Sequence, residues 1–382
     1  MSRYARAALF VAPWSLLLLL EAWTFAHWGS QPDFDSFWAS ARALRDGLNP
    51  YQLDRGALGQ GWQNVNPPTW FPLFLPLTML PLRLAFWTWR ILSLTLIAGT
   101  SVLLARRGTI EPRQLLLLLV SAPLWTTLID GQVYSVLMAL AAFAWVCLEK
   151  HRDWRAGVTL GILAALKPNL AVWPLLLLFA GRWKAVLASA AAALGALGLA
   201  TALFGIKTTL AWVEAFGIGS GMSWVESAQR ATPGTAAIGQ NASLTSLALR
   251  HGLDWLAQPA SLALIVAALV WVRIARPLIA QLNTAAVGVS LLAAPLAWVG
   301  YTLMLAPRLL RERWGAAEWA AVLLLCVPLM VVLRVQQDLY CAALALLTLS
   351  PVGPSLTALG SMRARIAGRL GTRWLPAGTT AP

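Results

Sequence analysis

Long apolar runs separated by short clusters of basic residues make up most of the chain. The first run, from Ala7 to Phe25, is about as long as the ~20 residues that a helix needs to cross a bilayer. Arg3 and Arg6 precede it as they would precede a secretory signal, but the following residues, FAHWGS, make a poor small-x-small cleavage site. We therefore expect this run to be the first transmembrane helix.

Further apolar runs predict single transmembrane helices. The basic clusters between the runs mark the cytoplasmic side of the membrane if the positive-inside rule holds. The predicted single crossings lie near residues 84–105, 184–204, 259–275, 316–333 and 338–351.

Three other runs begin and end at basic clusters, so each must return to the side where it started. Turn-forming residues interrupt each of them: IDGQ at 129–132, LKPN at 166–169 and APLAW at 294–298. The halves are short, about a dozen residues around LKPN, whereas ~17 to 25 are needed to span. Re-entrant hairpins would explain these lengths. Because non-helical backbone at membrane depth must be buried in protein or line a watery cavity, we expect the three tips to converge on one outward-facing cavity.

Composition supports a polytopic membrane protein, since 59% of the 382 residues are hydrophobic and 12% are charged, against roughly 25% charged in ordinary soluble domains. The net charge of +14 comes mostly from arginines scattered between apolar runs. This placement is typical of orientation signals rather than of nucleic-acid binding. The three cysteines lie inside apolar runs without a CxxC pattern, so neither a metal site nor a disulfide framework is indicated.

The predicted fold class is an all-α polytopic membrane protein of about 10 to 12 transmembrane or re-entrant helices. Residues 1–352 are expected to form one membrane domain with outer loops at 28–68 and 205–258, followed by a basic cytoplasmic tail at 353–382. We expect a multi-pass protein of the plasma (inner) membrane with both termini in the cytoplasm.

The stretch DFDSFWASARALRDGLNPY follows the first helix, where the chain leaves the membrane. Its apolar residues recur at helical spacing, which predicts an amphipathic helix lying on the outer interface. These residues are Phe34, Phe37, Trp38, Ala41, Leu44 and Leu48. We expect Asp33 or Asp35 to cap the helix and Gly47 to end it. The alternative role for one of these acids is a general base, held where a lipid-linked substrate meets a hydroxyl acceptor.

Six stretches, in order along the chain, resemble motifs of glycosyltransferase family 87, whose members are polytopic GT-C-type enzymes. They are DFDSFWASARALRDGLNPY, NPPTWFPLFLPLTMLPLRLAFWTW, GQVYSVLMALAAFAW, RAGVTLGILAALKPNLAVWPLLLL, NASLTSLALR and APLAWVGYTLMLAP. The resemblance implies a GT-C-type fold and an inverting transfer of a sugar, often mannose, from polyprenyl phosphate. The acceptor is a hydroxyl of a lipid-linked or glycan substrate on the outer face of the membrane. Tyr134 stands where the family often carries Asn, and Tyr301 where His is common, so the sugar and the acceptor stay open.

By the same resemblance, the acid after the first helix is the catalytic base. Its spacing to Phe34 and to the later NPY assigns the base to Asp33, with Asp35 as the competing choice. A phosphate leaving group needs positive charge or backbone donors to stabilise its developing oxyanion. Lys167, alone at an apolar hairpin tip, is the expected donor-phosphate ligand, and Arg334 is a second candidate. Snorkelling of the lysine to the interface and an ordinary loop-end arginine are the alternatives.

Five further residues are the expected contacts to the sugar or the acceptor: Asp130, Gln132, Asn241, Trp298 and Tyr301. Amide side chains carry both donors and acceptors, as recognition of sugar hydroxyls requires. For Asp130, Gln132 and Asn241, the alternative is that they only cap or end helices.

No cofactor is expected, because the three histidines lie in unrelated contexts. A divalent cation bridging an acid to the phosphate is compatible with the chemistry but not favoured. The expected partners are the polyprenyl-phosphate sugar donor, a lipid or glycan acceptor and membrane lipids, with no nucleic acid. The rival class is a transporter or flippase of a lipid-linked or anionic substrate, which broken helices would also serve. Acids concentrated on the outer side and the lack of an inverted sequence repeat favour the enzyme over that rival.

Overall fold

The part of the chain that the structure describes is helical. The computed structural model describes residues 3–27, 31–53, 64–106, 108, 110–216, 241–326 and 336–352. Within these ranges no strand forms, and the one extended pairing is an isolated antiparallel bridge between Asn241 and Trp298. The all-α prediction is therefore confirmed.

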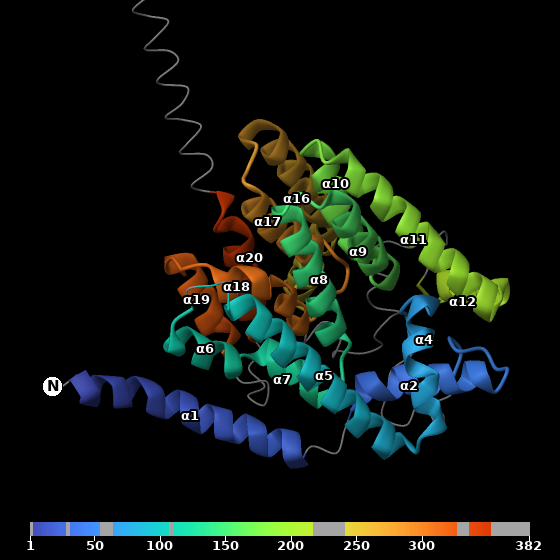
Figure 1. Cartoon of the computed structure of the whole chain (residues 1–382), viewed down its shortest axis with the longest axis horizontal. Helices are drawn as coiled ribbons and strands as arrows, with labels where there is room; N and C mark the ends of the chain where they lie inside the picture. The colour runs from blue at the N-terminus through green and yellow to red at the C-terminus, as the bar shows by residue number, and fades with distance from the viewer. Residues whose placement is uncertain are drawn as a thin grey trace, which may run out of the picture.

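The helices and 3-10 turns follow one another in a chain of short and long elements. They are α1 (Arg3–His27), α2 (Pro32–Arg45), η1 (Pro68–Trp70), α4 (Phe71–Phe74), η2 (Pro76–Met79), α5 (Leu82–Ala105), α6 (Pro112–Leu119), α7 (Ala122–Ile129), α8 (Tyr134–Glu149), α9 (Asp153–Leu166), η3 (Pro168–Ala171), α10 (Val172–Phe179), α11 (Trp183–Phe204), α12 (Ile206–Phe216), α15 (Leu244–Arg250), α16 (Asp254–Ala275), α17 (Ile279–Leu292), η4 (Val299–Leu305), α18 (Ala306–Arg311), α19 (Ala316–Leu325) and α20 (Gln336–Leu349). In Figure 1, α1 lies along one edge of the molecule and α11 lies on the outside of α9.

Three of the described helices are long and apolar enough to cross a membrane: α5, α11 and α16. They match the crossings predicted near residues 84–105, 184–204 and 259–275. The pair α6 and α7, bent by 40° at its break, would make a fourth span. Other apolar helices, such as α8 and α17, have between 10 and 17 residues, so the total of 10 to 12 crossings stays a prediction.

The three predicted breaks lie where the helices end. The first, at residues 129–132, separates α7 from α8, and the third, at 294–298, separates α17 from η4. At the second break, Lys167 is extended, with φ −143° and ψ 96°, between α9 and η3. Its conformation follows from Pro168, because a proline disfavours the helical conformation of the preceding residue.

The helix α2 confirms the predicted helical spacing but corrects the expectation that an aspartate caps it. It begins at Pro32, with Gln31 in the cap position, so Asp33 and Asp35 lie in the first turn and neither is the N-cap. Its apolar face is covered by protein, since Phe34 packs against Phe86 at 5.3 Å between ring centroids. The ring of Phe37 stacks on that of Phe74, with 4.7 Å between the ring centroids.

The C-terminus of α2 ends as predicted, at Gly47. Gly47 has φ +75°, and the N–H of Leu48 donates to the carbonyl of Ala43 at 2.8 Å. This is the Schellman arrangement that ends many helices, in which glycine takes the left-handed conformation at low cost.

The closest helix packing joins α9 to α11 through two glycines one turn apart. A Cβ on Gly157 would meet the carbonyl of Ala185, and one on Gly161 would meet the carbonyl of Ser189 and, at 2.7 Å, the Cβ of Ala192. Small residues at four-residue spacing let two helix backbones approach this closely. The crossing of α9 and α11 therefore requires residues without a Cβ at positions 157 and 161.

Replacing Gly161 by alanine should lower the free energy of unfolding by about 1 to 3 kcal/mol, because the added methyl overpacks the crossing. Gly195→Ala in α11 is the matched control, since a Cβ there meets nothing within 4 Å. Thermal unfolding of the purified protein in detergent measures both changes. Equal effects of the two substitutions would contradict the role of the glycine contact.

Candidate active site

The loop between α7 and α8 lies on the N-terminus of α2. Gly131 ends α7 with φ +70°, and the N–H of Gln132 donates to the carbonyl of Thr127 at 3.0 Å, which is again a Schellman arrangement. The carbonyl of Asp130 accepts a hydrogen bond from the N–H of Phe34 at 3.1 Å. One of the free donors in the first turn of α2 is thereby satisfied by a residue almost a hundred positions away.

Gly131 is required at this contact for two reasons. Its left-handed conformation is unfavourable for residues with a Cβ. A Cβ would also lie 2.6 Å from that of Phe34 and 2.8 Å from the ring of Phe86. The indole N–H of Trp89 donates to the Gly131 carbonyl at 2.9 Å and holds the loop in place. The acids on the two segments are thereby brought together.

Asp33 is the acid that faces the other functional groups. Its carboxylate accepts a hydrogen bond from the side chain of Gln132 and interacts electrostatically with Lys167. Burial raises the pKa of Asp33 to about 6, against the lowering effects of the Gln132 hydrogen bond and the Lys167 charge. An acid with this pKa is ionised at neutral pH and still basic enough to accept a proton.

Asp130 is the second acid of the pair. Burial and the nearby Asp33 charge raise the pKa of Asp130 well above its usual range, although the Arg90 charge lowers it. Two neighbouring carboxyl groups do not readily ionise together, so the pair favours holding one proton between its two members.

Arg90 of α5 connects the end of α7, next to Asp130, to the end of α1. Its guanidinium donates to the carbonyls of Leu128 at 3.2 Å and Phe25 at 3.1 Å, at the ends of α7 and α1. It also lies over the ring of Phe86, 4.1 Å from the centroid. A positive charge at helix C-termini is stabilising, and here it connects three helices behind Asp130.

Lys167 approaches Asp33 from the second hairpin. Its ammonium donates to the side-chain oxygen of Asn66 and lies 5.3 Å from the centroid of the Tyr301 ring. Burial lowers the pKa of the Lys167 ammonium to about 8, against the raising effect of the Asp33 charge. The lysine is therefore charged at neutral pH, as the prediction of a phosphate ligand requires.

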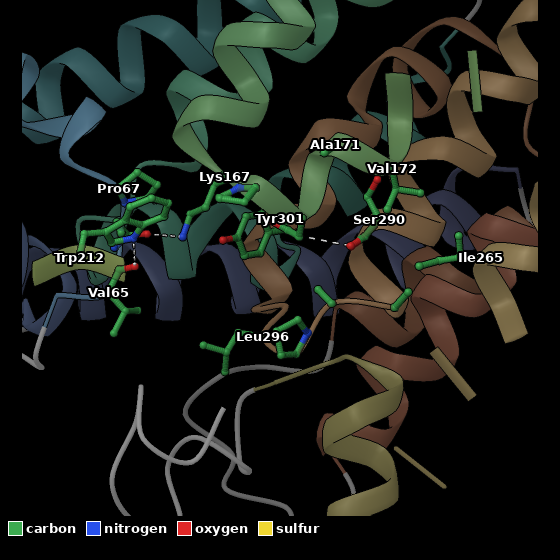
Figure 2. A pocket seen from close by; sticks show the side chains of 16 residues that line it. Val65, Pro67, Lys167, Ala171, Val172, Trp212, Ile265, Ser290, Leu296 and Tyr301 are labelled. Atoms are coloured by element: carbon green, nitrogen blue, oxygen red, sulfur yellow. Dashed lines mark hydrogen bonds between the residues drawn. The ribbon is translucent and has the colours of Figure 1, made fainter. Parts of the chain in front are cut away.

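Lys167 and Tyr301 line a cavity of about 320 Å³. Figure 2 shows the two side chains in the middle of the view, between Trp212 on one side and Ser290 on the other. The second and third hairpin tips both line it, through Lys167 to Asn169 and through Pro295 and Leu296. No residue of the first tip lines this cavity. Asp130 and Gln132 are linked to it only through Asp33, which interacts with Lys167.

The aromatic wall behind the acids is closely packed. The rings of Tyr134 and Tyr301 lie 4.4 Å apart between centroids. A Cβ on Gly300 would overlap the Tyr134 ring, so the glycine allows the contact. The two tyrosines therefore pack directly against each other.

Asp35, the alternative base, lies on a different side of α2. Residues two positions apart on an α-helix are about 200° apart, so Asp35 does not share the face on which Asp33 meets Gln132 and Lys167. Its side chain is buried.

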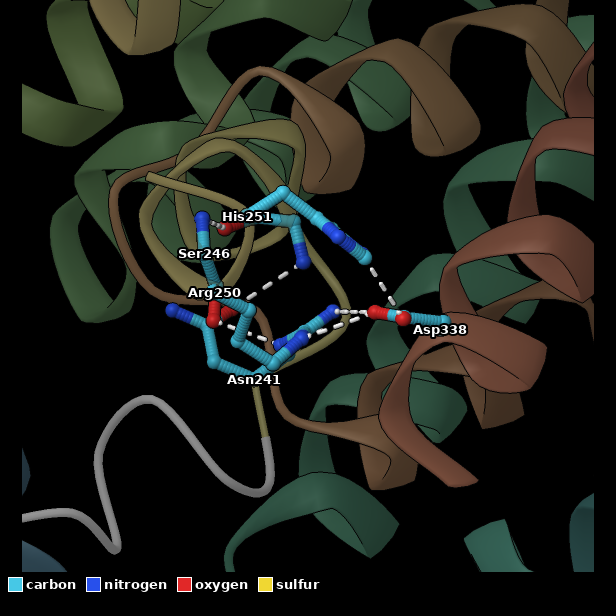
Figure 3. Close-up of polar contacts among 6 residues, drawn as sticks. Asn241, Ser246, Arg250, His251 and Asp338 are labelled. Atoms are coloured by element: carbon cyan, nitrogen blue, oxygen red, sulfur yellow. Dashed lines mark hydrogen bonds and ion pairs between the residues drawn. The ribbon is translucent and has the colours of Figure 1, made fainter. Parts of the chain in front are cut away.

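Asn241 has a structural position. Its side-chain oxygen accepts from the N–H groups of Ser243 and Ala297, and its amide donates to the carbonyl of Pro295 at 2.8 Å. Its carbonyl accepts from Arg250, which pairs with Asp338 at 2.7 Å (Figure 3). The amide thus fastens residues 241–243 to the third hairpin tip.

Of the two remaining predicted residues, one lies away from the cluster and the other is not described. Trp298 pairs with Asn241 through its backbone and does not line the cavity. Arg334 lies outside the described residues. Within the described ranges, no three His, Cys, Asp or Glu side chains form a group that could hold a metal ion.

Sequence reasoning missed Asn66 and Arg90. Asn66 precedes two prolines, which mark a fixed turn but say nothing of a partner 101 residues away. Arg90 had a usable signal, because an arginine inside a membrane-length helix is costly unless it is paired or functional.

Replacing Gly131 by alanine should destabilise the protein more than Gly47→Ala. Both glycines have positive φ, so each substitution costs about 1 to 2 kcal/mol of backbone strain. A Cβ on Gly47 meets nothing within 4 Å, whereas one on Gly131 overlaps Phe34 and Phe86. Comparison of the thermal unfolding midpoints measures the difference, and equal midpoints would show that the loop adapts.

Comparison with known proteins shows the family of the chain. The model of glycosyltransferase family 87 matches residues 64–298, which is more than half of the chain. The matched span contains Asp130, Gln132 and Lys167, and Asp33 precedes it. No curated protein and no solved structure matches the chain. The chain therefore belongs to glycosyltransferase family 87 and is a membrane glycosyltransferase.

Proposed function

We propose that the protein transfers a sugar, with mannose favoured by the family resemblance, from polyprenyl phosphate to a hydroxyl of a lipid-linked or glycan acceptor on the outer face of the membrane. The observation that carries this proposal is the electrostatic pairing of Asp33 with Lys167, which lines the cavity. A base and a cation side by side are the two groups that displacement of a phosphate by a hydroxyl requires.

In the proposed reaction, Asp33 accepts the proton of the acceptor hydroxyl. The hydroxyl oxygen forms a bond to the anomeric carbon while the bond from that carbon to the phosphate oxygen breaks. The electron pair leaves with the polyprenyl phosphate, and attack from the opposite side inverts the anomeric centre. Lys167 donates hydrogen bonds to the phosphate as its negative charge increases, so no general acid is required.

The charge of the cavity favours a donor with one phosphate. Lys167 is the one cationic side chain among the described residues that line the cavity. A sugar joined to a lipid through a single phosphate carries one negative charge, which one lysine can balance. A diphosphate-linked donor carries two negative charges and would need a further cation or metal ion.

A second cavity, of about 390 Å³, offers space for an isoprenoid chain. Apolar side chains make up most of its lining, among them Leu18 of α1, Leu94 of α5, Leu128 of α7 and Leu303 of η4. Leu128 precedes Asp130 by two residues and Leu303 follows Tyr301 by two, so this cavity lies close to the cluster in sequence. We assign the lipid part of the donor to it.

Asp33→Asn should reduce sugar transfer by at least about a hundredfold, because general-base catalysis is lost while the side chain keeps its size. Membranes carrying each variant are given radiolabelled polyprenyl-phosphate mannose, and label in lipid acceptors is counted. Asp35→Asn is the matched control and should keep most of the activity. Loss in Asp35→Asn alone would move the base by two residues. Absence of transfer by the wild type with mannose and other lipid-linked sugars would favour the transporter class.

The value of kcat/KM should rise as the pH passes about 6, when Asp33 ionises, and fall above about 8, when Lys167 loses its proton. Gln132→Leu removes a hydrogen bond that favours the charged carboxylate, so the pKa of Asp33 should rise. The acid limb of the profile should then move to higher pH by about half a unit to one unit. The alkaline limb is the internal control and should stay in place, and an acid limb that moves to lower pH would contradict this electrostatic account.

A further inference from the structure

Lys167 is held in the cavity by a neutral partner. Its ammonium donates to the side-chain oxygen of Asn66, and both residues line the cavity. An ammonium has three donors, and a neutral acceptor takes up one of them without cancelling the charge. Asn66 therefore adds no negative charge of its own beside the lysine.

The orientation of the Asn66 amide is fixed by a second asparagine. The backbone N–H and the side-chain amide of Asn66 both donate to the side-chain oxygen of Asn64, at 2.9 and 3.0 Å. A flipped Asn66 amide would turn its NH₂ toward the Lys167 ammonium and its oxygen toward the Asn64 oxygen, and both contacts would be repulsive. The oxygen of Asn66 thus points at Lys167.

The whole segment around Asn66 is joined to the hairpin that carries Lys167. The hydroxyl of Thr69 donates to the carbonyl of Ala165 at 2.8 Å, and the indole of Trp70 donates to the carbonyl of Leu166 at 2.9 Å. These bonds satisfy carbonyls at the end of α9 that have no partner within the helix. Asn66 and Lys167 are consequently placed by one rigid junction.

We propose that Asn66 is a positioning residue that aims the Lys167 ammonium at the donor phosphate without placing a second negative charge beside it, in addition to that of Asp33. This inference rests on the proposed function, because it assigns the phosphate to Lys167. An aspartate at this position would hold the lysine equally well but would neutralise it. Replacing Asn66 by aspartate therefore tests the effect of charge, and replacing it by alanine tests the effect of position.

The test measures binding of geranylgeranyl phosphate to the purified full chain in detergent, by quenching of tryptophan fluorescence. Asn66→Asp should weaken binding by about tenfold or more, because a carboxylate beside Lys167 competes with the phosphate. Asn66→Ala should weaken it less, because the charge stays and the position is lost. The matched control is Asn169→Asp, which adds the same charge to the same cavity at a residue whose amide donates to the Ser290 carbonyl instead. It should weaken binding less than Asn66→Asp does.

Four outcomes decide between the roles. Stronger loss in Asn66→Asp than in both Asn66→Ala and Asn169→Asp, with unchanged unfolding midpoints, supports the inference. Equal loss in Asn66→Asp and Asn66→Ala with lowered midpoints would make Asn66 structural and overturn it. Equal loss in the two aspartate variants would reduce the effect to the overall charge of the cavity and also overturn it. If wild type and Lys167→Met bind the lipid phosphate equally, the phosphate assignment of the proposed function fails, and the inference fails with it.

Discussion

The hydrogen bond from the Phe34 N–H to the Asp130 carbonyl is the contact on which the site depends. A buried helix terminus needs acceptors for its free N–H groups, and here the acceptor is supplied by a loop almost a hundred residues further along the chain. Satisfying that need brings Asp33 beside Gln132 and Asp130. The two acids are neighbours because a helix start and a helix end meet, and Gly131 lets them meet closely.

The charges around this contact alternate. Arg90 lies near Asp130, Asp33 lies between Asp130 and Lys167, and Lys167 ends on the neutral Asn66. Burying charges costs solvation free energy, which close opposite charges and hydrogen bonds partly recover. With one proton shared by the two acids, Arg90, Lys167 and the acid pair together carry one more positive than negative charge, which an anionic ligand would balance.

Local signals in the sequence were enough to find the helix breaks, because Gly131 and Pro168 act on their own backbone. The separate choices of Asp33 and Lys167 came from a family resemblance and from the cost of a lone lysine, and their pairing is seen only in the structure. The N-cap was wrongly predicted, since Pro32 already starts α2. Asn66 was missed because its partner, Lys167, is brought to it by tertiary packing. No spacing of residues within the segment around Asn66 reveals that contact.

The glycine crossing of α9 and α11 has a consequence for the chemistry at the other end of α9. Lys167 follows Gly161 by six residues, about 9 Å along a helix. Because the crossing lets the two backbones touch, α9 has little freedom to slide against α11. A slip of a single turn, about 5.4 Å, would carry the ammonium away from both Asn66 and Asp33. Because Gly157 and Gly161 have no Cβ, the packing of α9 on α11 thus fixes the position of the Lys167 ammonium at the cavity.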